Sequence, residues 1–114
     1  MYGHGSRDAP PRKVGFEDLG ELRKEIWKLV DEEALEIDWP HILAARHRIG
    51  REEVIATLLE GRLEFHSDLD GRFVSRADTA RFTITAIFEV LEEGDRRFLH
   101  IRTAFKSRSR ARRR

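Results

Sequence analysis

Apolar residues recur at two spacings along the chain, and the change of spacing predicts helices followed by strands. From Phe16 they recur every three or four residues, which lines one face of a helix over residues 16–34. The residues on this face are Leu19, Leu22, Ile26, Leu29 and Val30. Apolar and acidic residues then alternate from Leu35 to Trp39, which indicates a short, half-buried strand.

Two further helices are expected before the spacing changes. Pro40 can open the first, over residues 41–48, because proline is well tolerated at the first helical position. Gly50 is the expected N-cap of the second, over residues 51–60. Glu53 stands at its third helical position, as in a capping box.

After Gly61, which ends this helix, the apolar period becomes two. Strands separated by turn residues are predicted over 63–66, 72–76, 81–91 and 97–105. Two registers are open on the longest strand, and the more apolar one turns Phe82, Ile84, Ala86, Phe88 and Val90 toward the helices rather than Thr83, Thr85, Ile87 and Leu91. The sequence therefore predicts an α+β fold, with N-terminal helices packed on a small antiparallel β-sheet and an extra N-terminal helix.

The expected organisation is one folded domain with appendages. Residues 1–15 contain three glycines, Pro10-Pro11 and few apolar side chains, which favours a disordered leader. Residues 16–35 form the extra amphipathic helix, residues 36–106 the α+β domain and residues 107–114 a basic tail. The near-heptad leucine stripe of the extra helix also suggests self-association as a homodimer.

Composition restricts the class of protein further. The chain of 114 residues has no cysteine and is 38% charged, which excludes a disulfide framework and a cysteine zinc site. No apolar run approaches the roughly 20 residues of a membrane span. The histidines His41, His66 and His100 match no zinc-ligand spacing. We therefore expect a cytoplasmic protein with no membrane partner, no metal and no cofactor.

The charges are strongly separated along the chain. Residues 16–39 carry nine acidic and three basic side chains, whereas residues 96–114 carry nine basic ones and no acidic one. A basic end attracts phosphate, so Arg108 and Arg110 are predicted to contact RNA with a steep salt dependence.

The last strand holds the candidate catalytic residues. Strict alternation would place Leu99, Ile101 and Phe105 on the helix side and the even-numbered positions on the other side, as Phe98, His100, Arg102, Ala104 and Lys106. RNA cleavage by the neighbouring 2′-hydroxyl needs a base, an acid and a stabiliser of the charged phosphorane, which His100, Arg102 and Lys106 can supply without a metal. The alternative is a solvated polar face, which antiparallel sheets often have.

Four short stretches from Glu36 onward share a pattern with a known family. They are Ile37-Asp38-Trp39-Pro40, Arg46-His47-Arg48-Ile49-Gly50-Arg51-Glu52-Glu53-Val54, Gly71-Arg72-Phe73-Val74-Ser75-Arg76 and Phe98-Leu99-His100-Ile101-Arg102-Thr103-Ala104-Phe105. In these stretches the chain resembles the BrnT type of toxin, within the RelE-like ribonuclease superfamily of bacterial toxin–antitoxin systems. The helix over residues 16–34 has no counterpart there.

The resemblance implies a metal-independent endoribonuclease toxin with a RelE/BrnT-like fold, which cleaves RNA through 2′-hydroxyl attack and pairs with a cognate antitoxin protein. It implies that the basic residues around the scissile phosphate are Arg46, His47, Arg81, Arg102 and Lys106. The alternative is a non-catalytic module of the same fold that binds nucleic acid or an acidic protein.

Overall fold

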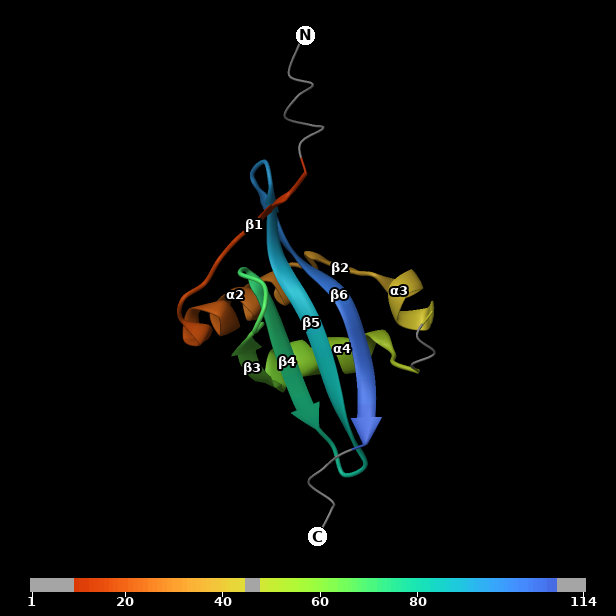
Figure 1. Cartoon of the computed structure of the whole chain (residues 1–114). Helices are drawn as coiled ribbons and strands as arrows, with labels where there is room; N and C mark the ends of the chain where they lie inside the picture. The colour runs from red at the N-terminus through yellow and green to blue at the C-terminus, as the bar shows by residue number, and fades with distance from the viewer. Residues whose placement is uncertain (1–9, 45–47, 109–114) are drawn as a thin grey trace.

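Three helices and six strands make up the part of the chain that the computed structural model describes, residues 10–44 and 48–108. Figure 1 shows them in the order β1 (Arg12–Lys13), α2 (Leu19–Asp31), β2 (Leu35–Ile37), α3 (Trp39–Ala44), α4 (Arg51–Glu60), β3 (Arg62–Phe65), β4 (Arg72–Asp78), β5 (Phe82–Glu93) and β6 (Arg96–Arg108). From α2 onward, this is the order that the apolar spacing predicts. The α+β class is confirmed.

The described strands form one mixed sheet. Its main path runs β2-β6-β5-β4-β3, and β1 pairs separately with β5. The four consecutive strands β3 to β6 pair antiparallel with their chain neighbours, as expected. Strand β2 instead lies parallel to β6, with Leu35 opposite Leu99. An early segment of the chain therefore lies beside the last strand.

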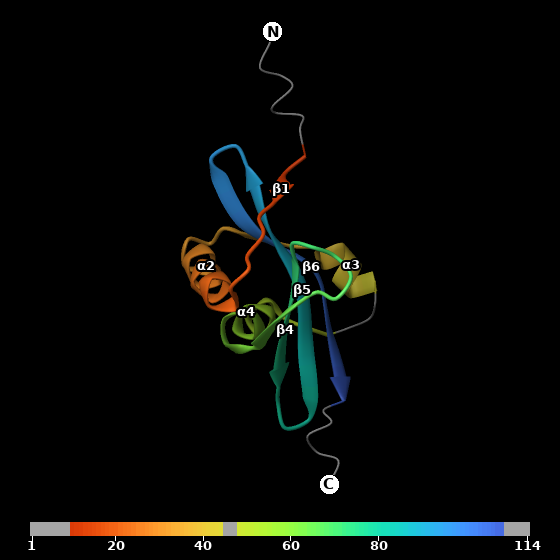
Figure 2. The same ribbon diagram turned by 60° about the vertical axis from the view of Figure 1, so that its left-hand side comes forward.

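The helices α2 and α4 lie on one side of this sheet, as Figure 2 shows, and the core fills the space between. Strand β5 turns its more apolar set toward them, which confirms the first of the two registers. Leu99 and Ile101 are fully buried as predicted, and Trp39 is only half-buried. The buried core residues are Leu22, Ile26, Leu29, Ile42, Ile49, Val54, Leu58, Phe73, Ala86, Phe88, Val90, Leu99, Ile101 and Ala104.

Helix α4 has the boundaries that the sequence predicts. The Gly50 amide donates to Glu53 Oε1 at 2.9 Å, which completes one half of the expected capping box. At the other end the Gly61 amide donates to the Thr57 carbonyl. A Cβ at Gly61 would stand 2.4 Å from Ser75 Oγ, so no larger residue fits where the helix end meets β4.

Helix α2 is shorter than residues 16–34 because local side-chain and backbone geometry sets both ends. Asp18 caps its start by accepting a hydrogen bond from the Gly20 amide at 2.7 Å. Glu33, with φ of 57°, turns the chain away after Asp31. Helix α3 likewise begins at Trp39 rather than His41, and Arg48 lies outside it.

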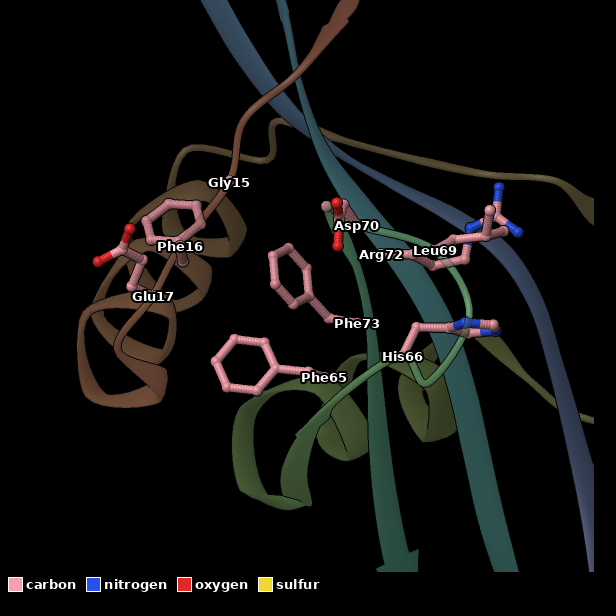
Figure 3. Close-up of a pocket in the computed structure, with 10 residues that line it drawn as sticks. Gly15, Phe16, Glu17, Phe65, His66, Leu69, Asp70, Arg72 and Phe73 are labelled. Carbon is pink, nitrogen blue, oxygen red and sulfur yellow. The ribbon is translucent and has the colours of Figure 1, made fainter.

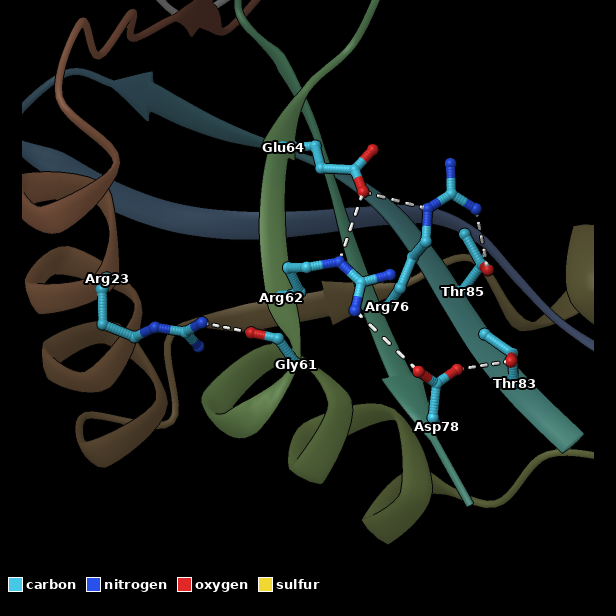
Figure 4. A network of polar contacts seen from close by, with 8 residues as sticks. All are labelled: Arg23, Gly61, Arg62, Glu64, Arg76, Asp78, Thr83 and Thr85. Atoms are coloured by element: carbon cyan, nitrogen blue, oxygen red, sulfur yellow. Dashed lines mark hydrogen bonds and ion pairs between the residues drawn. The ribbon is translucent and has the colours of Figure 1, made fainter. Parts of the chain in front are cut away.

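One arginine joins the extra helix α2 to the end of α4. The Arg23 guanidinium donates to the carbonyls of Leu58 and Leu59, at 2.8 and 2.5 Å, and to that of Gly61 (Figure 4). These carbonyls are left without intrahelical partners at a helix C-terminus, where a cation is favoured. Burial lowers the pKa of Arg23. Helix α2 is therefore built into the same core as the rest of the domain.

The two ends of the chain correct the predicted boundaries. The expected disordered leader is wrong for its last residues, because Arg12–Lys13 form β1 and the Val14 amide donates to the Val90 carbonyl at 2.8 Å. The start of the expected basic tail, up to Arg108, belongs to β6. The remainder of both predictions, residues 1–9 and 109–114, lies outside the described residues.

None of the helices in the described part of the chain has both the length and the apolar character needed to cross a membrane.

Candidate functional site

A β-bulge in the last strand decides which of its side chains share a face. Thr103 lies opposite Ile87, but the next residue of β5, Phe88, lies opposite Ile101. Arg102 is therefore the extra residue of the bulge, and the alternation of β6 shifts by one position at this point.

This shift makes the predicted grouping of His100, Arg102 and Lys106 on one face wrong. Lys106 is paired with the buried Ile84 and lies on the helix side. Its ammonium is 3.3 Å from Glu53 Oε2 of α4 and 4.5 Å from the centre of the Phe82 ring. Ala104 is on the helix side for the same reason. The prediction assumed unbroken alternation, but a bulge reverses the faces of the side chains that follow it in the strand.

On the other face, three neighbouring strands place Arg72, Glu89 and His100 side by side. Arg72 of β4 is the register partner of Glu89 on β5, which is in turn the partner of His100 on β6. Directly opposite residues on antiparallel strands point to the same side of the sheet and lie within contact distance. Glu89 is thus flanked from both neighbouring strands, and its side chain is only 2% exposed.

Four basic groups surround the Glu89 carboxylate. Arg72 contributes Nη2 at 2.9 Å and Nε at 3.0 Å from Oε2, and Lys13 contributes Nζ at 3.3 Å from the same oxygen. On the other oxygen, Oε1, Arg102 Nη1 lies at 3.5 Å and His100 Nδ1 at 4.0 Å. We call these five residues, Lys13, Arg72, Glu89, His100 and Arg102, the Glu89 cluster.

The cluster holds its carboxylate ionised. Burial alone would raise the pKa of Glu89, but the hydrogen bonds and charges of Arg72 and Lys13 outweigh it and lower the pKa below its ordinary value. Three fixed cations against one carboxylate leave two positive charges in excess, even with His100 neutral. Arg102, with 45% of its side chain exposed, presents part of this excess to solvent.

His100 is held in a distinctive setting. Its Nδ1 is buried and, within the described residues, is the one buried side-chain nitrogen or oxygen that lacks a hydrogen-bond partner. That atom lies on the side of the Glu89 carboxylate, while a quarter of the side chain remains exposed. The two nitrogens of the ring therefore differ, because Nδ1 is enclosed on the side of the Glu89 carboxylate.

Of the predicted site residues, His100 and Arg102 come together and the others in the described region do not. Arg81 precedes β5, and Arg108 pairs with Phe82 at that same end of the sheet, whereas Glu89 lies toward the other end of the strand. The predicted RNA contacts Arg46, His47 and Arg110 fall outside the described residues.

Sequence reasoning missed Glu89, Arg72 and Lys13. A signal for Glu89 was present, since it is the lone charged residue between Phe82 and Leu91 in a strand of apolar, threonine and alanine residues. Arg72 could not be paired with it without the β4–β5 register. Lys13 falls within residues 1–15, where the sequence favours a disordered leader.

Further along the same sheet, β3 to β5 carry a second polar network (Figure 4). Glu64 Oε2 lies 3.3 Å from Arg76 Nε and 3.7 Å from Arg62 Nε, and Asp78 Oδ1 accepts from the Thr83 hydroxyl at 2.6 Å. These carboxylates are 40–47% exposed, in contrast with Glu89. A groove of about 210 Å³ is lined by Val74, Arg76, Thr85, Ile87 and Phe105, with His66 and Ser67 of the β3–β4 loop.

Comparison of the chain with protein-family models, with curated proteins and with solved structures finds no significant match. Among residues 10–44 and 48–108, no group of three histidine, aspartate or glutamate side chains is placed to hold a metal ion.

Proposed function

We propose that the protein is a metal-independent endoribonuclease of the RelE-like, BrnT-type class, the toxin of a toxin–antitoxin pair in the cytoplasm, and that the Glu89 cluster is its active site. The observation that carries this proposal is the set of basic groups fixed around one buried, ionised carboxylate. Cations held in place before the substrate arrives stabilise a phosphorane without reorganising during the reaction.

In the proposed reaction, His100 Nε2 takes the proton of the RNA 2′-hydroxyl. The 2′ oxygen then forms a bond to phosphorus while the bond to the 5′ oxygen breaks, which yields a 2′,3′-cyclic phosphate and a 5′-hydroxyl end. Glu89 acts as a positioning residue, because its carboxylate lies 4.0 Å from Nδ1 on the buried side of the ring and leaves Nε2 for the substrate.

The cations have separate tasks in this proposal. Arg102 and Arg72, on opposite sides of Glu89, stabilise the charge on the non-bridging phosphate oxygens. Lys13, with 41% of its side chain exposed, is the group that gives a proton to the leaving 5′ oxygen. In this proposal, the side chains of the protein supply every group that RNA cleavage needs, and no metal or cofactor takes part.

The partners follow from the same charges. An exposed cationic surface attracts RNA from solution, and an antitoxin protein would silence it by covering the cluster with an acidic segment. The arginines of residues 107–114 add further phosphate contacts that carry no sequence preference.

Cleavage of single-stranded RNA in the presence of EDTA tests the proposal. The wild type should release products with 2′,3′-cyclic phosphate ends, and His100→Ala should lower the rate by about 10²-fold or more, as for loss of a general base. His41→Ala is the matched control, since this exposed histidine lies on α3, outside the Glu89 cluster. Equal rates for the two variants would exclude His100 as the base.

A non-catalytic binding module is the second candidate, favoured by the depth of Glu89, which solvent scarcely reaches. In that case the wild type binds RNA with a strong salt dependence and does not cleave it under any condition. Arg102→Ala would then weaken binding alone.

A further inference from the structure

Strand β1 lies at the end of β5 and brings Lys13 to the Glu89 cluster. It has two residues, both exposed, and it pairs with β5 so that Arg12 lies opposite Glu92 and Lys13 opposite Leu91. Figure 2 shows this segment passing the end of β5 before the chain reaches α2. A short terminal strand with little buried apolar surface opens at a low cost in free energy, while the rest of the sheet stays folded.

The contacts that hold β1 are mostly ion pairs at the surface. Arg12 Nη2 lies 2.5 Å from Glu92 Oε1, with 79% of the arginine side chain exposed. Lys13 Nζ lies 3.3 Å from Glu89 Oε2, with 41% of the lysine side chain exposed. Val14 is half-buried against the core, and its amide donates to a carbonyl of β5. Exposed ion pairs stabilise little, because water and salt compete with them.

The chain is anchored more firmly two residues beyond Val14. The Phe16 ring packs edge-on against the buried Phe73 ring, with the ring centres 6.1 Å apart (Figure 3). Gly15 stands between this anchor and β1, and a Cβ added to it would meet no atom within 4 Å. A pocket of about 480 Å³ lies beside it, between residues 15–17 and the β3–β4 loop. A glycine with open space around it is suited to act as a hinge.

The cations of the Glu89 cluster are therefore held unequally. Arg72 and Arg102 belong to the long strands β4 and β6, and Arg72 binds the carboxylate through both Nη2 and Nε. Lys13 is carried by a strand of two residues at the margin of the sheet. In the reaction proposed above, Lys13 gives a proton to the leaving 5′ oxygen, so the active site is complete only while β1 is in place.

We infer that residues 12–14 form a strap, hinged at Gly15, that opens in the free protein and is held closed by bound RNA, with Lys13 against the Glu89 cluster. The structure shows the closed state. A ligand shifts an equilibrium toward the state to which it binds more tightly, and a phosphate beside the cluster attracts the Lys13 ammonium only when the strap is closed. Closure by RNA rests on the proposed function, whereas opening does not.

Amide hydrogen exchange, measured by NMR on the full chain, tests the opening of the strap. The Val14 amide should be protected at least about 10²-fold less than that of Ala86 in the central strand β5, because local opening costs less free energy than global unfolding. Lys13→Met keeps the aliphatic part of the side chain and removes its ion pair, and it should lower Val14 protection about fivefold. Lys24→Met removes an exposed ion pair of α2 and is the matched control, with no change at Val14. Equal protection of Val14 and Ala86, or no effect of Lys13→Met, overturns the inference.

A five-nucleotide 2′-O-methyl RNA tests the closure, because it has no 2′-hydroxyl and cannot be cleaved. At saturation it should raise Val14 protection in the wild type about tenfold, as expected for two coupled equilibria. In the Lys13→Met protein the same RNA should change Val14 protection by less than about twofold, because the coupling through the ammonium is lost. Equal increases in the two proteins overturn closure through Lys13, since the RNA would then cover the strap without using this side chain.

The outcomes separate the strap from the ribonuclease. Bound RNA that leaves Val14 protection unchanged overturns the closure, even in a protein that cleaves RNA. Closure in a protein that never cleaves RNA supports the strap and removes the ribonuclease. A wild type that binds no RNA overturns both the closure and the proposed function, and the exchange rates of the free protein then decide the opening alone.

Discussion

Phe88 and Glu89 are neighbours in the chain and equally buried, but they are buried in opposite ways. Phe88 points toward the helices and is surrounded by apolar side chains. Glu89 points to the other face and is covered by the charged groups of Arg72, Lys13 and Arg102. The first arrangement follows from the hydrophobic effect, which gains free energy with each apolar surface removed from water.

The second arrangement gains little stability, because the desolvation of a carboxylate and its partners offsets their attraction. What it does provide is a set of cations fixed beside an imidazole. The contrast teaches that the helix side of the sheet forms the apolar core, whereas the other face buries one carboxylate among cations. Substitutions on the two faces should therefore differ in how their effects depend on salt and pH, as well as in the size of the stability loss.

The largest effect is expected on the helix side. Phe88→Ala should lower the free energy of unfolding by about 4 kcal/mol, because it removes a buried ring and leaves a cavity. Urea denaturation at low and high salt measures it, and the loss should be the same in both. A loss that shrinks markedly in salt would show that charge, rather than packing, dominates this face.

Glu89→Gln keeps the size of the side chain and removes its charge. It should lower the free energy of unfolding by about 3 kcal/mol, because three cations then crowd together without their counter-ion. Glu64→Gln, whose ion pairs are exposed, is the control and should change stability by less than about 1 kcal/mol. Similar losses in the two variants would remove the distinction between the buried and exposed carboxylates.

Lowering the pH should reduce the contribution of Glu89 to the free energy of unfolding and leave that of the apolar core unchanged. The pKa of Glu89 is lowered in the folded state below that of an ordinary carboxyl group, so its contribution to stability is complete above the ordinary pKa. This contribution is lost as the pH falls below the ordinary pKa and through the lower folded-state pKa. Denaturation of the wild type and of the Glu89→Gln protein from pH 7 to pH 3 should show a smaller decline in the variant. Parallel declines would contradict a lowered pKa at Glu89.

The smallest effect is expected at Lys106, which the bulge moves to the helix side. Its ion pair with Glu53 is partly exposed on both sides, so Lys106→Ala should lower the free energy of unfolding by about 0.5 kcal/mol. A double-mutant cycle with Glu53→Gln measures the coupling of the two side chains. Zero coupling would place Lys106 away from α4.

The sequence predicted the parts of the fold that rest on local patterns. The capping residues of α4 and the apolar register of β5 were readable because each depends on a few neighbouring residues. The bulge at Arg102 was not, because no residue type marks it and strict alternation gives the wrong face for Lys106. Pairing of β2 with β6 and of β1 with β5 joins segments far apart in the chain, which no local pattern specifies.

The candidate site was predicted only in part for the same reason. His100 and Arg102 lie on one strand before the alternation shifts, so their common face was readable. Glu89, Arg72 and Lys13 come from three other strands, and their meeting depends on three registers.

The most direct measurement compares RNA cleavage in EDTA by the Arg102→Ala and Lys106→Ala proteins. The two residues are four apart on β6 and lie on opposite faces of the sheet. If the Glu89 cluster is the active site, Arg102→Ala should lower the rate by about 10²-fold, as for loss of one oxyanion donor, and Lys106→Ala should stay within about twofold of the wild type. A large loss in the Lys106→Ala protein with full activity in the Arg102→Ala protein would contradict it and place the active site on the helix side.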